Sequence, residues 1–239
     1  KAAKVGAVEA AAAGLNWTFA PMVDISRDAR WGREMEGAGE DPYLGCKIAE
    51  ARVKGFQGDD IGADNTIVAC AKHFAGYGFA ESGKDYNTAD VGTSTLYNVL
   101  LPPFKAAADA GVATFMNSFN ELNGVPATGD KFLQREILKG KWNWKGMMVS
   151  DWGSIGEMIA HGYAADGKHA AELAANAGSD MDMESALYVV HLKGLVENGK
   201  VSEANINDAV RRILKLKFDM GLFDDPYKYC DVNREKATV

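Results

Sequence analysis

The sequence predicts an α/β fold of the (β/α)8-barrel type, in which short buried strands alternate with helices. Five short apolar segments each end in polar side chains, near residues 17–24, 67–73, 112–117, 146–151 and 177–182. Helical patterns separate these segments, as expected for a parallel sheet with both faces covered. Because a barrel presents functional groups at the carboxyl ends of its strands, we expect the five polar ends to face one pocket.

The helices are predicted from periodicity and from their end signals. Asp41-Pro42 is a typical helix start with proline in the first turn, and Ser202 is a typical cap. Pro102-Pro103 requires a break or kink in the helix that contains it. The predicted helices cover residues 1–14, 42–57, 95–110, 131–138, 155–161, 168–176, 185–198 and 202–220.

The domain organisation follows from the strand count. A closed barrel of this type needs about eight strands, and five are recognised, so we expect a barrel that is incomplete at its amino terminus. We assign residues 1–226 to this (β/α) barrel domain. Residues 227–239 are polar and unpatterned, and we interpret them as the start of a linker to a second domain absent from the chain. The first residues are helical without a cap or an initiator methionine, which indicates that the chain begins inside a larger protein.

Composition excludes several function classes. The chain has 239 residues, 47% hydrophobic and 25% charged, with a formal net charge of −7 and no basic stripe. These values argue against nucleic acid or an anionic membrane as a partner and favour a neutral ligand. No apolar run approaches the roughly 18 residues of a membrane span. The three cysteines are too scattered for a disulfide framework or a metal site.

The most informative segment is the apolar run 147–149, which ends in Ser150-Asp151-Trp152. A carboxylate at the end of a buried strand, beside a flat aromatic ring, is typical of a catalytic nucleophile in a barrel. The long segment 76–92 is expected to cover the pocket, because loops of this length in compact domains are usually functional.

Residues 27–42 contain three arginines, five acids and Trp31. Arginine forks paired with carboxylates form a rigid polar wall suited to binding hydroxyl groups. A solvated loop of ion pairs is the alternative.

Lys72-His73 offers several hydrogen-bonding groups at a strand end. Neighbouring strand residues face opposite ways, so both reach one ligand only where the backbone is distorted. Otherwise His73 is a satisfied core residue. In residues 116–124, Asn120 or Asn123 is expected to cap a turn, and Asp180 with Asp182 is either part of the pocket or a charge cluster before a helix.

No metal site or cofactor site is predicted. His161, His169 and His191 lie in helical segments away from the strand ends, which leaves His73 without ligands at a suitable spacing. A glycine-rich phosphate loop is also absent from the sequence.

Together these motifs resemble glycoside hydrolase family 3, of the β-glucosidase and β-xylosidase types, close to the periplasmic bacterial β-glucosidases. The resemblance extends over about residues 16–227. The matching segments are NWTFAPMVDISRDARWGREMEGAGEDPYLG, ACAKHFAGYG, FMNSFNELNGVPATG, MVSDWGS, AGSDMDM and MGLFDDPY.

The resemblance implies a retaining, exo-acting β-glucosidase that needs no cofactor. Asp151 is then the nucleophile that forms a glycosyl-enzyme, with a β-glucoside or oligosaccharide as substrate. Phe119 stands where many relatives have tyrosine, which removes one hydroxyl near the nucleophile. The residues implied to bind the glycone or line the pocket are Arg33, Lys72, His73, Met116, Phe119 and Trp152.

The acid/base is implied to be a glutamate of a following α/β sandwich domain. Other family members use a histidine on the loop after the KHF motif, but no histidine occurs between His73 and His161. Glu81 and Asp85 lie on that loop and are expected to be solvated. A periplasmic or secreted location follows from the resemblance alone.

Three alternatives remain open. The isolated chain is a non-catalytic sugar-binding module, or a β-xylosidase of the same family, or an aldolase-like lyase in which Lys72 forms a Schiff base.

Overall fold

Five parallel segments lie side by side in the computed structural model, which describes residues 1–238. Three of them form a sheet of order β1-β2-β5, with β1 at Cys70–Phe74, β2 at Thr114–Asn117 and β5 at Met147–Val149. Parallel bridges extend both edges: Trp17 pairs with Val68 and Met22 with Lys72, and Met181 pairs with Val149. The five predicted strand positions are therefore confirmed, and within the described residues they form an open sheet without a closed barrel.

Two strand boundaries were predicted wrongly. The segment expected near residues 67–73 forms β1 only from Cys70 onward, and β1 continues to Phe74. The extended segment at residues 17–23 makes isolated bridges in place of a continuous ladder. A β-bulge between Ala71 and Phe74 interrupts the pairing of β1 with β2, and the peptide bonds Lys72–His73 and Phe74–Ala75 are cis.

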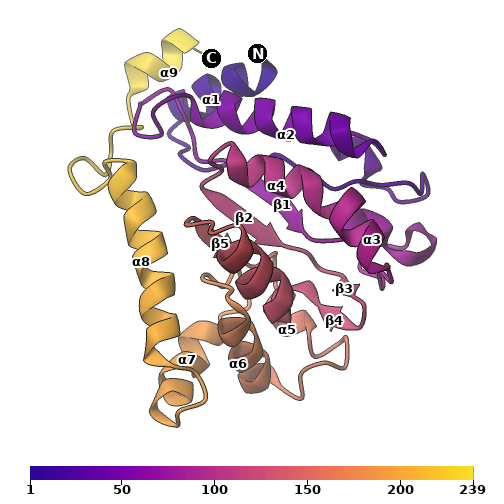
Figure 1. Cartoon of the computed structure of the whole chain (residues 1–239). Helices are drawn as coiled ribbons and strands as arrows, with labels where there is room; N and C mark the ends of the chain where they lie inside the picture. The colour runs from indigo at the N-terminus through magenta and orange to yellow at the C-terminus, as the bar shows by residue number, and fades with distance from the viewer. Residues whose placement is uncertain (239) are drawn as a thin grey trace.

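Helices cover both faces and one end of this sheet (Figure 1). Asp41 caps α2 through its side chain and Ser202 caps α8, both as predicted. The expected irregularity before Pro102 is a π-helical segment, η4, which precedes α4. The helices are α1 (Ala2–Ala12), α2 (Pro42–Gln57), α3 (Thr93–Thr95), η4 (Leu96–Leu100), α4 (Leu101–Asp109), η6 (Phe132–Lys141), α5 (Ser154–Glu157), α6 (Gly167–Ala177), α7 (Leu187–Glu197), α8 (Glu203–Asp219) and α9 (Val232–Thr238).

Alternate residues of each strand pack on opposite faces of the sheet, as strand geometry requires. Phe115 and Met148 point to one face, where they pack in a large cluster with residues of α2, α4 and η6. Met116 and Met147 point to the other face. There they join Cys70 and Val149, and Ile213 of α8 packs against this second cluster.

The two long loops after β1 and β2 are tied to each other. A hairpin of β3 (Glu121–Leu122) and β4 (Val125–Pro126) turns at Asn123-Gly124, a sequence that favours such turns. The side chain of Asn123 accepts from Val91 N at 2.8 Å and donates to Val91 O at 3.1 Å. The prediction that Asn120 or Asn123 serves a turn is therefore confirmed for Asn123. The side chain of Asn123 also fixes the end of the segment 76–92.

The first of these loops also packs tightly on the segment that follows residue 23. A Cβ atom at Gly78 would lie 2.3 Å from the carbonyl oxygen of Ile25, so only glycine allows this approach. The contact brings the loop after β1 over the pocket region.

The chain ends lie together, with α9 packed on α1 (Figure 1). Tyr229, in the segment predicted as the start of a linker, is buried against Ala7 and Ala11. Within residues 1–238, no helix combines the length and apolar character needed to cross a bilayer.

A cleft of about 500 Å³ lies at the amino-terminal ends of the strands, between α8 and the turns before β2 and β5. Its walls include Trp144, Lys145, Arg212 and Asp59. None of the predicted site residues lines it, so the candidate site is at the opposite end of the sheet.

Candidate active site

His73 forms the centre of the site, because it lies between two carboxylates from different segments. Its Nδ1 is 2.9 Å from Asp24 Oδ2, and its Nε2 is 3.5 Å from Asp151 Oδ2. Its backbone N–H also donates to Asp24 Oδ2 at 2.8 Å. His73 and Asp24 are only 1% and 2% exposed, so this contact is shielded from solvent.

Asp151 lies in a tight turn directly after β5. The backbone N–H of Trp152 donates to Asp151 Oδ1 at 2.7 Å, and Ser154 N donates to Asp151 O at 3.1 Å. Gly153, at φ 67°, allows the chain to turn into α5. Asp151 Oδ2 is buried and has no hydrogen-bond partner among the described residues. One carboxylate oxygen is thus held by the backbone, and the other is available.

The segment 179–183 holds this turn in place. Ser150 N donates to Met181 O at 2.9 Å, and Gly153 N donates to Met183 O at 3.0 Å. Met183 N in turn donates to the hydroxyl of Ser150 at 2.8 Å. Asp151 therefore lies between two hydrogen-bonded positions, which fixes the direction of its side chain.

Burial raises the pKa of Asp151 above the ordinary value of 3.8. Nearby groups oppose this shift. His73 lowers the pKa of Asp151 most, followed by the hydrogen bond from the Trp152 backbone N–H and by the charges of Lys72 and Arg33. The charges of Lys72 and Arg33 thus favour the ionised form of Asp151. The bulge within β1 supplies the distorted backbone that Lys72-His73 requires.

Arg33 forms the polar wall that residues 27–42 were expected to provide. It makes a bidentate pair with Glu36, at 2.7 and 2.9 Å, and its guanidinium lies 5.5 Å from the ring centre of Tyr77. The hydrogen bonds between Arg33 and Glu36 are the chief reason that the pKa of Arg33 is raised and the pKa of Glu36 is lowered. Arg30 and Asp28 form a second pair that is largely exposed, so the alternative of a solvated ion pair applies to that part of the loop.

Trp31 is the buried aromatic residue of the same arginine-rich loop. Its ring is 2% exposed, and its Nε1 donates to Asp85 Oδ1 at 2.9 Å. Asp85 is exposed, as expected for a loop acid, and one of its oxygens also accepts this hydrogen bond from the buried indole. This bond ties the segment 76–92 to the arginine-rich loop.

Aromatic rings line the site beside His73. Phe119 lies 4.3 Å from Tyr86 and 5.8 Å from Tyr77, measured between ring centres. Trp152 is 64% exposed at the surface, whereas Met116 is 2% exposed. Met116 packs against Cys70, Met147 and Val149 within the sheet, which places it in the apolar layer beneath the polar groups.

Two site residues were missed from the sequence as candidates. Asp24 was recognised as a polar strand end, but its contact with His73 depends on the pairing of two segments 49 residues apart. Glu157 of α5 has a buried oxygen, Oε2, without a partner among the described residues, and its pKa is raised by burial and by the charge of Asp151. Glu157 follows Asp151 by six residues in a predicted helix, and nothing in the sequence indicated that the two carboxylates influence each other.

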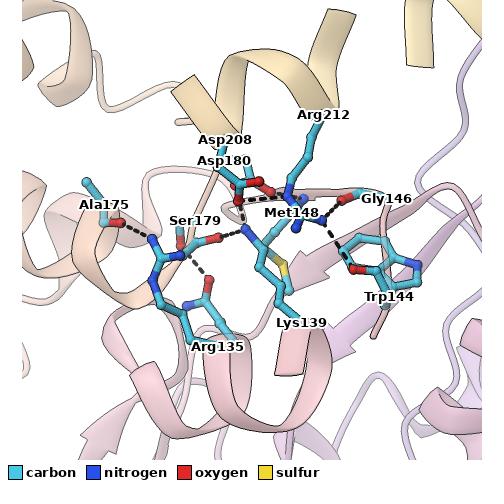
Figure 2. Close-up of polar contacts among 12 residues, drawn as sticks. Arg135, Lys139, Trp144, Gly146, Met148, Ala175, Ser179, Asp180, Asp208 and Arg212 are labelled. Carbon is cyan, nitrogen blue, oxygen red and sulfur yellow. Dashed lines mark hydrogen bonds and ion pairs between the residues drawn. The ribbon is translucent and has the colours of Figure 1, made fainter. Parts of the chain in front are cut away.

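A separate polar network lies beneath the site, where the sheet meets η6 (Figure 2). Lys139 pairs with Asp180 at 2.5 Å and donates to Gly178 O at 2.7 Å. Asp180 Oδ2 accepts from Met148 N at 2.9 Å. Asp180 is thus directed away from the pocket and anchors β5 three residues before Asp151, contrary to the expectation of five polar ends in one pocket.

Neighbouring groups extend this anchor. Arg212 of α8 donates to Gly146 O at 2.8 Å, at the start of β5, and Figure 2 shows it on the same side as Asp208. Asp182 accepts from Ser185 and from Tyr188 N, so it serves the start of α7. Asn117 donates to Ser179 at 2.6 Å. These contacts position the ends of β2 and β5 and the start of α7.

No group of three or more candidate metal ligands occurs within residues 1–238. Asp151 combines a carboxylate oxygen without a hydrogen-bond partner with the electrostatic influence of three cationic or potentially cationic side chains, His73, Lys72 and Arg33. Such a set can bind hydroxyl groups and stabilise a carboxylate that acts as a nucleophile.

We predict that Asp151→Asn makes the chain more stable at neutral pH. The raised pKa of Asp151 means that folding disfavours its ionised form, so the cost is present above the folded-state pKa and absent once the carboxyl is protonated in both states. Urea unfolding should therefore show a stability gain near pH 7 that declines as the pH falls toward about 4. The exposed Asp90→Asn is the control, and an equal gain in both variants would contradict the burial argument.

We predict that Lys139→Met strongly destabilises the chain. Burial lowers the pKa of Lys139 and raises that of Asp180, so each partner depends on the other and on its hydrogen bonds. Removing one partner of a buried pair costs about 3–5 kcal/mol. Lys105→Met breaks an exposed pair with Asp109 and should cost less than about 1 kcal/mol. Urea unfolding of both variants tests the difference, and equal losses would show that burial of the pair does not matter.

Comparison with known proteins gives the family of this chain. The model of the glycosyl hydrolase family 3 N terminal domain matches residues 1–216. A periplasmic β-glucosidase of Salmonella typhimurium is 48% identical over 95% of this chain, and a putative β-xylosidase of Formosa agariphila is 35% identical over 97%. These matches cover 30% and 31% of the relatives.

Solved structures agree with the sequence matches. A mutant β-glucosidase from Listeria innocua in complex with laminaribiose has a TM-score of 0.97 and 44% identity, over 99% of this chain and 33% of its own. The same enzyme in complex with glucose has a TM-score of 0.92 and 43% identity. The chain thus spans about a third of the length of these relatives, and it belongs to glycosyl hydrolase family 3, of which it contains the N-terminal domain.

Proposed function

We propose that this chain is the nucleophile-bearing domain of a retaining, exo-acting β-glucosidase. The observation that carries the proposal is Asp151, a largely buried carboxylate at the end of β5 whose Oδ2 has no hydrogen-bond partner. His73, Lys72 and Arg33 favour its ionised form. The related β-glucosidase from Listeria innocua has been solved in complex with glucose and, as a mutant, with laminaribiose, which supports a β-glucoside as substrate.

Asp151 Oδ2 attacks the anomeric carbon of the terminal sugar in the proposed mechanism. The bond from that carbon to the leaving-group oxygen breaks, and the oxygen takes a proton from an acid. Water then attacks the same carbon and gives one proton back to the conjugate base of that acid, and Asp151 leaves as a carboxylate. Because Oδ1 stays bonded to Trp152 N, the reacting oxygen is defined by the backbone.

The glycone would lie against the cationic side of the pocket. Arg33, Lys72 and His73 supply donors to the sugar hydroxyls, while Phe119 supplies an apolar ring face. Trp152, which is exposed beside Asp151, is placed to contact the ring at the pocket entrance. Met116 supports this surface from the layer beneath.

The acid/base is assigned to a following α/β sandwich domain of a longer protein, consistent with relatives about three times the length of this chain. Glu157 is a second pocket carboxyl with a raised pKa, as a general acid requires. The two possibilities predict different leaving-group dependence. If the acid lies in another domain, the isolated chain hydrolyses only reagents with an acidic leaving group, which need no general acid. If Glu157 is the acid, the chain also hydrolyses glucosides with poor leaving groups.

The parent protein is proposed to be periplasmic or secreted, because the relative from Salmonella typhimurium is described as periplasmic. Further strands from the parent chain would complete the (β/α)8 barrel. A β-xylosidase is the second candidate, since relatives with that description are 34–37% identical to this chain. Glucose and xylose differ by one hydroxymethyl group, so direct comparison of the two glycosides decides between them.

We predict that Asp151→Gly abolishes hydrolysis of 2,4-dinitrophenyl β-glucoside by the chain. Loss of a covalent nucleophile should lower the rate by about 10³-fold or more. Azide should restore turnover and yield the α-glucosyl azide, because it attacks from the face that Asp151 occupied. Asp90→Gly is the control, and the β-xyloside is measured in parallel.

Three results would contradict this assignment or part of it. Unchanged activity of Asp151→Gly would exclude Asp151 as the nucleophile. Faster reaction of the xyloside would favour a β-xylosidase. If the folded chain binds glucose but shows no hydrolysis that depends on Asp151, the chain is a sugar-binding module.

A further inference from the structure

Asp24 is a buried carboxylate that the proposed mechanism does not use. It follows the first extended segment, and it touches the proposed nucleophile only through His73. Asp24 Oδ2 accepts two hydrogen bonds from that one residue, from the backbone N–H at 2.8 Å and from ring Nδ1 at 2.9 Å. The opposite ring nitrogen, Nε2, lies 3.5 Å from Asp151 Oδ2.

We propose that Asp24 is a positioning residue, which fixes the tautomer and the orientation of His73 so that Nε2 faces Asp151 and the glycone. The importance of this role for catalysis rests on the proposed function. The hydrogen-bond geometry itself does not depend on it.

The tautomer follows from the chemistry of the partner. An ionised carboxylate oxygen only accepts hydrogen bonds, so Nδ1 carries a proton when it lies 2.9 Å from Asp24 Oδ2. Nε2 is then the ring nitrogen directed to Asp151, 3.5 Å from its Oδ2. It is also the ring nitrogen that faces the pocket.

The orientation follows from the second bond and from packing. Because the His73 backbone N–H binds the same oxygen as Nδ1, Asp24 ties the ring to its own main chain. The ring of Tyr77 lies edge-on at 4.9 Å from the imidazole. With 1% exposure, His73 has little access to water that could replace Asp24. The ring is therefore held in one orientation.

An amide provides a conservative comparison. In Asp24→Asn, the amide oxygen can occupy the position of Oδ2 and accept both bonds without the charge. In Asp24→Ala, both donors of His73 lose their acceptor. The positioning role therefore predicts a loss in the alanine variant and its rescue in the asparagine variant.

The first test is ¹⁵N NMR of the histidine rings in the whole chain, with His73 assigned by its absence in His73→Gln. We expect a protonated Nδ1 in the wild type and in Asp24→Asn, and loss of the fixed Nδ1 proton in Asp24→Ala. A wild-type ring without a proton on Nδ1 would overturn the proposal, whatever the variants do. This test needs no substrate, so it stays valid if the proposed function fails.

The second test is a double-mutant cycle on the hydrolysis of 2,4-dinitrophenyl β-glucoside. We expect Asp24→Ala to lower kcat/KM by about 10- to 100-fold, as for other losses of a supporting hydrogen bond, and Asp24→Asn to stay within about threefold. If Asp24 acts through His73, adding Asp24→Ala to His73→Gln causes no further loss. Additive losses would show that Asp24 acts by another route and would overturn the proposal.

Folding is checked by the near-ultraviolet circular dichroism of each variant. If Asp24→Ala does not fold, Asp24→Ser replaces it, because the serine hydroxyl supplies one acceptor for two donors. A normal NMR result together with an inactive wild-type chain would refute the proposed function and leave the positioning role intact.

Discussion

The buried contact of His73 with two carboxylates is the interaction on which the pocket depends. It joins three segments that are distant in sequence, ending at Asp24, His73 and Asp151. Their side chains meet only because the extended segment at residue 22 pairs with β1, and β1 with β2 and then β5. A shift of any of these pairings by one residue would turn the corresponding side chain to the opposite face of the sheet.

Burial of the Asp151 carboxylate disfavours its ionised form, and the surrounding structure offsets this electrostatic cost. Burial raises the pKa of Asp151, while His73, Lys72 and Arg33 oppose the shift. The turn around Asp151 is held by the segment 179–183, and the buried pair of Lys139 and Asp180 anchors that segment to β5. Catalytic sites commonly retain such unfavourable groups because function requires them. The ion pair of Lys139 and Asp180 thus ties β5 to the segment that holds the turn of Asp151.

Much of the fold was predictable from the sequence, because the signals are local. The capped starts of α2 and α8, the Asn123-Gly124 turn and the five apolar segments were all recognised. The start of β1 was misjudged, because a bulge shifts the pairing and apolar character alone does not reveal it.

The site was predictable only in part. His73 lies 3.5 Å from Asp151, and the assignment of Arg33, Lys72 and Phe119 to the same binding site remains a prediction. Of the two alternatives given for Asp180 and Asp182, the role before a helix holds for Asp182, which accepts from Ser185 and Tyr188 N. The partner of Asp180, Lys139, is set by the three-dimensional arrangement and could not be recognised from the sequence. The same limit explains Asp24 and Glu157, whose environment is set by tertiary contacts.

The central claim is that Asp151 is a nucleophile which the folded chain already presents to a sugar. The most direct measurement is to incubate the chain with 2,4-dinitrophenyl 2-deoxy-2-fluoro-β-glucoside, whose leaving group needs no acid, and to read the intact mass and the labelled peptide. The account predicts a single stable adduct on Asp151. A label on another residue, or a folded chain that stays unlabelled, would contradict it.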